Sequence, residues 1–204
     1  MPTATFNPTG KYLIVNNTSP GGGTNFNTQR TLSDAVSANN LGSVAFHNCR
    51  EDSSSWYLIT RVFLWFDTST LPDNAVISSA KLVFPAVNST SSDNTLGFGF
   101  TTHTAASTPT TADWDSCTIN SPTEFTTRIA LTSLSTSGTT DVALNANGLS
   151  AISKSASTPI LLRGSLDIDN SAPVNLNEPT FDYSAFVLSV TYTSEGGSFL
   201  LNFV

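Results

Sequence analysis

Residues 61–84 constrain the fold of this chain more than any other stretch, because they read as a strand, a tight corner and a second strand. Side chains on a strand alternate between two faces. The first strand here carries on one face Val62, Leu64 and Phe66, and on the other Arg61, Phe63 and Trp65. A strand with one solvated face has polar residues on that face, but both faces here are bulky and largely apolar. We expect either that the chain itself covers both faces or that one face awaits a partner.

The composition favours β-structure. Only 11% of the 204 residues are charged, whereas about 25% are charged in an average soluble protein. Ser, Thr and Asn fill the polar positions, and they suit strands and turns better than helices. Strands are expected at residues 12–15, 44–46, 56–66, 77–84, 96–100, 128–131, 140–144, 160–163 and 186–192, and one short helix at residues 147–153.

Many short strands separated by turn residues predict an all-β fold, an antiparallel β-sandwich or jelly roll with one short helix. A chain of 204 residues is of ordinary length for one such domain. We therefore assign residues 1–193 to a single β-sandwich domain and residues 194–204 to an apolar C-terminal tail.

The charge pattern argues against two classes of partner. The formal net charge is −7 and the eight Lys and Arg residues are scattered, whereas nucleic acids and anionic membranes require clustered positive charge. No apolar run approaches the roughly 20 residues that span a bilayer, and residues 1–6 lack the charged and apolar regions of a signal peptide. We expect no nucleic-acid partner and no membrane partner.

Six short motifs follow one another between residues 63 and 192. They read Phe63-Leu64-x-Phe66-Asp67-Thr68-Ser69-x-Leu71-Pro72, Ala75-x-Ile77-x-Ser79-Ala80-x-Leu82, Ala112-Asp113-Trp114, Leu144-Asn145-x-x-Gly148-Leu149-x-x-Ile152, Leu162-Arg163-x-x-x-Asp167-x-Asp169-Asn170-x-x-Pro173 and Leu188-Ser-Val-Thr-Tyr192. In this order they resemble the DNRLRE-type β-sandwich module over about residues 55–193. Such modules are similar to carbohydrate-binding jelly rolls of secreted bacterial proteins, and look-alikes occur as free-standing proteins in phage and environmental virus genomes. The resemblance implies binding or structural roles and brings no catalytic residues.

Aromatic residues offer a candidate sugar-binding surface. Flat aromatic faces beside polar groups bind sugar rings, and Trp65 and Trp114 are the candidates for such a platform. The alternative for each is packing in the core. For Phe63 and Trp65 a third reading is contact with a partner subunit.

Two further clusters contain candidate ligand groups. Asp167, Asp169 and Asn170 present oxygen atoms of the kind that calcium prefers, although the loop lacks the Gly and the terminal Glu of an EF-hand. The alternative is that these groups cap backbone donors in a turn. Cys49 and Cys117 are the only cysteines; they form one disulfide in an oxidising compartment or remain two thiols.

Residues after 193 form the second informative feature of the sequence. A Glu-Gly-Gly-Ser hinge at residues 195–198 precedes the apolar positions Phe199, Leu200, Leu201, Phe203 and Val204. A disordered terminus is normally polar. We expect this segment to add a strand to its own sheet or to an exposed edge of a neighbouring subunit.

These features predict a non-enzymatic structural protein of a virion or another extracellular assembly, such as a capsid decoration protein or a fibre or filament subunit. Its partners would be further copies of itself or other structural subunits. The alternative is a carbohydrate-binding module that uses exposed Trp65 and Trp114 and a calcium loop. A hydrolase or lyase has no convincing residue set, and no cofactor is expected apart from calcium in that alternative.

Overall fold

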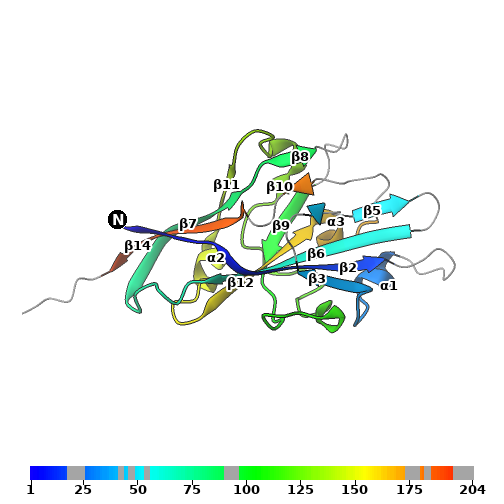
Figure 1. Ribbon diagram of the computed structural model, residues 1–204, viewed down its shortest axis with the longest axis horizontal. Helices are drawn as coiled ribbons and strands as arrows, with labels where there is room; N and C mark the ends of the chain where they lie inside the picture. Colours follow the sequence, from blue (N-terminus) through cyan, green and yellow to red (C-terminus); the bar gives the residue numbers. More distant parts are fainter. Residues whose placement is uncertain are drawn as a thin grey trace, which may run out of the picture.

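The computed structural model describes residues 1–17, 26–40, 44–45, 49–52, 56–89, 97–172, 180–181 and 185–194. Antiparallel strands in two packed sheets make up most of their regular secondary structure (Figure 1). The predicted all-β sandwich is therefore confirmed.

The smaller sheet has four strands. Its order is β1 (Thr3–Phe6), β14 (Val187–Ser194), β7 (Ala75–Phe84) and β11 (Thr140–Ala143). Strand β7 contains a bulge, because Ser79 pairs with Thr191 and Ile77 pairs with the next residue of β14, Tyr192. Strand β14 ends beside the N-terminus, at the left tip of the molecule in Figure 1.

The larger sheet forms the body of the molecule. Its order is β10 (Ile129–Ala130), β9 (Gly97–Thr101), β12 (Ser157–Gly164), β6 (Trp56–Asp67), β2 (Pro8–Asn17) and β3 (Ser37–Asn40), and β5 (Cys49–Asp52) also pairs with β6. A third, small sheet has the order β4 (Val44–Ala45), β13 (Thr180–Phe181) and β8 (Val87–Ser89).

Short helices connect the strands. They are α1 (Phe26–Arg30), α2 (Ala146–Ala151) and α3 (Ser165–Asp169), with 3₁₀ turns at Thr111–Asp113 and Leu131–Ser133. Helix α2 confirms the helix predicted at residues 147–153, and the side chain of Asn145 caps it by accepting from the Gly148 amide. Helices α1 and α3 correct the expectation of a single helix.

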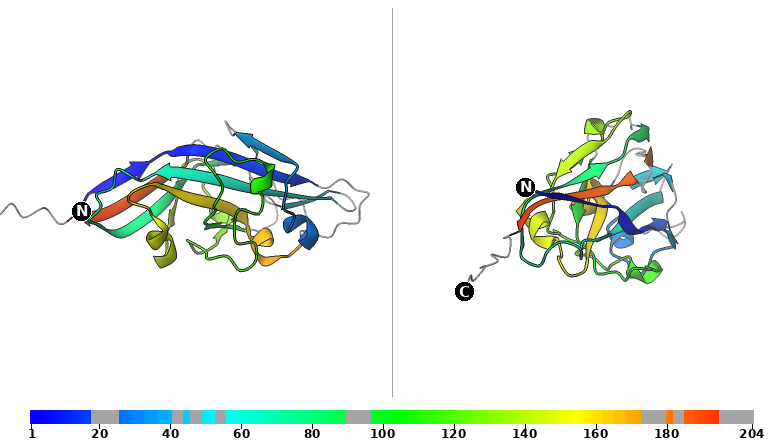
Figure 2. Two further views of the ribbon diagram at one scale, coloured as in Figure 1. Left: turned by 90° about the horizontal axis from the view of Figure 1, so that it is seen from below. Right: turned by 60° about the vertical axis from the view of Figure 1, so that its left-hand side comes forward.

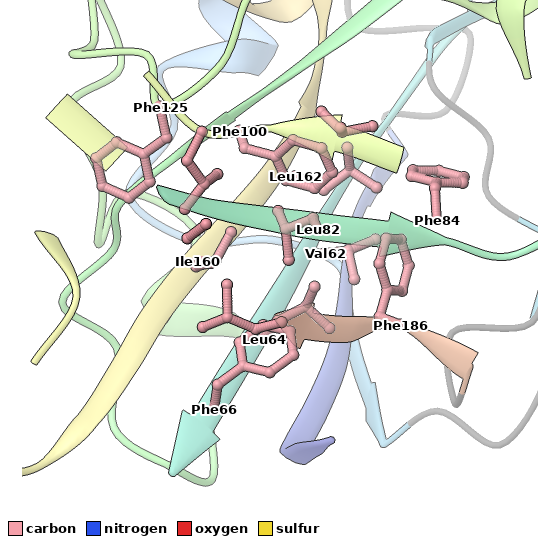
Figure 3. Close-up of a cluster of buried hydrophobic side chains, with 14 of the residues drawn as sticks. Val62, Leu64, Phe66, Leu82, Phe84, Phe100, Phe125, Ile160, Leu162 and Phe186 are labelled. Carbon is pink, nitrogen blue, oxygen red and sulfur yellow. The ribbon is translucent and has the colours of Figure 1, made fainter. Parts of the chain in front are cut away.

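The main core lies between the two sheets (Figure 3). Val62, Leu64 and Phe66 of β6 contribute one face to this core and are fully buried. A group of phenylalanines closes one end of it, with the Phe84 ring centroid 5.0 Å from that of Phe98 and 4.7 Å from that of Phe186. Burial of this apolar area supplies the main stabilisation of the sandwich.

A second apolar cluster covers the opposite face of β6. Its buried members are Ile14, Phe26, Ile59, Phe63, Trp65, Ala105, Trp114 and Leu161. They come from the large sheet, from α1 and from the segment that follows β9; the left view of Figure 2 shows α1 on the underside of the long strands. The chain itself thus covers both faces of residues 61–66. The expectation that Phe63 and Trp65 contact a partner is wrong, because Phe63 is fully buried and Trp65 is 7% exposed within one chain.

The sequence pattern locates the strands with regular apolar alternation. Each of the ranges expected as strands overlaps an observed one, from β2 to β14. Strands β1, β3, β5, β8 and β13 escape the pattern, because they are only two to four residues long and mostly polar. Their pairing is imposed by neighbouring strands and not by their own side chains.

Candidate functional site

A cluster of four buried charges lies under the large sheet. Arg61 of β6 and Arg163 of β12 are direct partners in the antiparallel pair, Arg30 ends α1, and Asp167 lies in the first turn of α3. All four residues have no solvent exposure. The strand register and the short connection from β12 to α3 therefore bring these side chains together.

The Asp167 carboxylate is the centre of this cluster. Arg61 donates to it twice, from Nε to Oδ2 at 2.9 Å and from Nη2 to Oδ1 at 2.8 Å. Arg163 does the same, with distances of 2.8 and 3.0 Å, and Nε of Arg30 lies 3.3 Å from Oδ1. Paired hydrogen bonds of this kind are among the strongest in proteins.

Each guanidinium group also donates to a backbone carbonyl of the segment 114–120. Arg61 donates to the carbonyl of Trp114 at 2.6 Å, Arg163 to that of Thr118 at 2.9 Å, and Arg30 to that of Ile119 at 2.7 Å. The Arg61 guanidinium also lies 3.8 Å from the centroid of the Trp114 ring, a cation–π contact. The cluster thus fixes a segment that has no regular strand of its own.

The charges determine the protonation state of Asp167. Burial alone raises the pKa of its carboxyl, but the positive charges and hydrogen bonds of Arg61 and Arg163 outweigh that effect and hold the pKa well below its usual range. Burial lowers the pKa of Arg30, and the Asp167 charge opposes this. The ionised Asp167 of α3 therefore connects Arg61 of β6 and Arg163 of β12 to Arg30 of α1.

The calcium loop proposed from the sequence does not form. Asp167 is buried among arginines, Asp169 pairs with Arg128, and Asn170 is the left-handed C-cap of α3 with φ 54°. The three residues have separate partners and do not converge on one point. Among the residues that the structure describes, no group of three or more His, Cys, Asp or Glu side chains is arranged to hold a metal ion.

The proposed sugar platform is also wrong. Trp114 is fully buried and Trp65 is 7% exposed. The Trp65 ring packs edge-to-face with Tyr12 at 6.0 Å and with His103 at 4.6 Å. Neither indole can present a flat face to a sugar, and both belong to the second apolar cluster.

His103 is buried beside the second apolar cluster. Its Nε2 lies 3.2 Å from the carbonyl of Leu64 and therefore donates to it. Burial lowers the pKa of His103 to about 4, against the opposing effects of that hydrogen bond and of Asp113. His103 is neutral at pH 7 and packs against Phe63 and Trp65.

Two further carboxylates, those of Asp67 and Asp113, stabilise turns. Asp67 accepts from the Ser69 amide at 3.1 Å and from its hydroxyl at 2.6 Å, an Asx turn at the end of β6. Asp113 accepts from the Thr110 amide at 2.8 Å. Cys117 carries a free thiol and forms no disulfide in this structure, which agrees with the alternative of two thiols; the side chain of Cys49 lies outside the described residues.

The outer face of the four-stranded sheet is a surface that sequence reasoning missed. Ser79 and Lys81 of β7, Ser189 and Thr191 of β14, and Ala143 of β11 line a shallow groove of about 340 Å³ there. Lys81 pairs across the strands with Asp141 at 2.5 Å. The signal in the sequence was the alternation of small polar residues with core residues along β7 and β14.

A second groove adjoins the first at Ala143. It has a volume of about 570 Å³ and lies between the edge strands of the two sheets, with β10 on one side and β11 on the other. Ile129 and Val142, which belong to the main core, form part of its lining. This groove marks the open side of the sandwich.

Comparison with known proteins gives no family for this chain. No protein-family model matches it, and a search of curated proteins finds no match. The resemblance to the DNRLRE-type module therefore stays a prediction. No helix among the described residues is long and apolar enough to cross a membrane, and the predicted contact residues 199–204 lie outside the described residues.

Proposed function

We propose that this chain is a non-enzymatic structural subunit that associates with further copies of itself in a virion or another extracellular assembly. The role is that of a decoration protein or of a fibre or filament subunit. The carbohydrate-binding alternative loses support, because Trp65 and Trp114 are buried and its calcium loop does not form.

The character of the four-stranded sheet supports this proposal. Its outer face is built largely from Ser, Thr, Ala and Val side chains. The charges of Lys81 and Asp141 on this face neutralise each other in an ion pair. Such a face can pack against another protein surface without leaving an unpaired charge buried. The exposed side chain of Val76 adds an apolar contact on β7.

The observation that carries the proposal is the apolar segment 199–204, which follows this sheet after a four-residue hinge. Strand β14 ends at Ser194, inside a sheet whose two edges are β1 and β11. The apolar, uncharged sequence of residues 199–204 has the composition of an added strand. The hydrogen bonds of Asp167, His103 and Asp67 all join parts of the fold to one another.

The test compares the full chain with a form that ends at Ser194. Every described strand lies within residues 3–194, so the shorter form keeps the observed fold. Size-exclusion chromatography with light scattering should show assemblies of the full chain that grow with concentration, and a monomer for the shorter form. A monomer in both cases, up to the highest soluble concentration, would refute self-association.

A further inference from the structure

We propose that the open edge of β11 is the acceptor for the apolar segment, and that residues 199–204 of a second copy pair with it as an added strand. This inference rests on the proposed self-association and names the surface that mediates it. Three features of the described residues support it: the backbone groups at the edge, the groove beside the edge, and the distance from the end of β14.

The first feature is the direction of the backbone groups of β11. Among the described residues β11 pairs with β7 alone. The Leu144 amide continues this pairing by donating to the carbonyl of Ala80 at 2.9 Å. Hydrogen bonding alternates along an antiparallel strand, so Val142 also bonds to β7, whereas the amides and carbonyls of Asp141 and Ala143 face the open edge. They form a template for another strand.

The second feature is the groove between β10 and β11, which has room for the side chains of such a strand. Ile129 and Val142 in its lining are apolar and belong to the core, and Ala130 and Ala143 are small. The segment 199–204 alternates suitably, because Phe199, Leu201 and Phe203 fall on one face of a strand. That face would cover the open side of the sandwich.

The third feature is distance, which identifies the occupant as a second copy. Ser194 pairs with Ala75, whereas Ala143 pairs with Lys81 further along β7. Their separation is about 20 Å along β7 and about 10 Å across the two strand spacings from β14 to β11, or about 22 Å in total, and a strand added beyond β11 lies one spacing further. The five residues from Ser194 to Phe199 span about 17 Å when fully extended. A chain therefore cannot lay its whole segment along its own β11.

A complementation experiment tests this arrangement. Ala143→Pro in the full chain removes the backbone amide that faces the open edge of β11, because Pro has no N–H group. This variant keeps the segment 199–204 but lacks an edge that can accept a strand. The form ending at Ser194 has the edge without the segment. Each should be a monomer alone, and their mixture should give a one-to-one heterodimer by light scattering.

The matched control is Thr5→Pro in the full chain. The Tyr192 amide donates to the carbonyl of Pro2, so by the same alternation the Thr5 amide faces the open edge of β1. This variant carries the same backbone change on the other edge of the sheet and should assemble like the unmodified chain. A native circular dichroism spectrum and melting temperature confirm folding of both variants.

The outcomes separate the two proposals. The Ala143→Pro chain could assemble to the same size as the unmodified chain while truncation at Ser194 still abolishes assembly. That result would refute the assignment of the segment to the β11 edge but would leave the proposal of self-association intact. Loss of assembly in Thr5→Pro alone assigns the segment to β1 and also overturns this inference. Hydrogen exchange gives a second readout: the Asp141 and Ala143 amides should exchange slowly in the assembly and quickly in the truncated monomer.

Discussion

Arg61 and Asp167 lie 106 residues apart in the chain, and their side chains form a two-pronged ion pair with no exposure to solvent. Arg163 binds the same carboxylate in the same way. With Arg30 the cluster gathers three positive charges around the Asp167 carboxylate, which forms an ion pair with each of the three arginines. The structure therefore depends on this one carboxylate more than on any surface ion pair.

Replacement of Asp167 by Asn should destabilise the protein strongly. The amide keeps the size of the side chain but removes the negative charge that Asp167 shares with three buried guanidinium groups. Removal of one member of a buried ion pair costs about 3–5 kcal/mol. The free energy of unfolding, measured by urea denaturation at pH 7, should fall by about that amount.

Asp169→Asn is the matched control for this change. Its carboxylate is half exposed and pairs with Arg128 at the surface, where ion pairs contribute about 0–1 kcal/mol. Equal losses in the two variants would show that burial of Asp167 does not determine its contribution.

The pH dependence of stability should follow His103. Its pKa of about 4 in the folded chain lies below the ordinary value of 6.5, so the unfolded chain binds more protons between these two values. Stability is therefore fully present above pH 6.5 and falls as the pH decreases toward 4, by about 3 kcal/mol in total. Urea denaturation from pH 7.5 to pH 4 measures this loss, and His103→Gln should remove most of the slope in that window. An unchanged slope in the variant would assign the titration to another group.

Local pattern was sufficient to predict the sandwich but not the charged cluster. Val62, Leu64 and Phe66 repeat with the period of a strand, and the period alone predicts a buried face. The cover over Phe63 and Trp65 comes from α1 and the segment after β9, which sequence spacing does not relate to β6. Only the three-dimensional structure could therefore decide whether the chain itself or a partner covers Phe63 and Trp65.

Asp167 illustrates the same limit at the level of a site. An Asp beside Asp169 and Asn170 resembles a cation loop when only neighbours in sequence are considered. Two of its three arginine partners, Arg30 and Arg61, lie more than a hundred residues away. One signal was present: Arg61 and Arg163 each occur within an apolar strand, and a buried arginine requires a buried acceptor.

Gly148 should be intolerant of even a methyl group. A Cβ atom at this position would lie 2.7 Å from the carbonyl oxygen of Phe125 and 3.0 Å from Cβ of Leu144. Alanine normally stabilises a helix relative to glycine, but here overpacking should dominate and lower the free energy of unfolding by about 1–3 kcal/mol. Thermal and urea denaturation of Gly148→Ala measure the effect.

Gly138→Ala provides the comparison for Gly148. Its added Cβ would lie 3.5 Å from the Ser135 hydroxyl, an ordinary contact. The change should alter stability by less than about 0.5 kcal/mol. A similar loss at both positions would indicate that backbone freedom, and not the contact with Phe125, explains the glycine in α2.

Lengthening the hinge should convert the assembly into a self-complemented monomer. If residues 199–204 bind β11 of another copy because their own edge is out of reach, an insertion of about nine Gly and Ser residues after Gly197 removes that restriction. The segment would then reach its own Ala143 and run antiparallel to β11, and intramolecular binding at a high effective concentration should displace the second copy. Light scattering should report a monomer, and the Asp141 and Ala143 amides should stay protected from hydrogen exchange. Assemblies of unchanged size would contradict the distance argument, and a monomer with unprotected amides would place the segment on a surface other than β11.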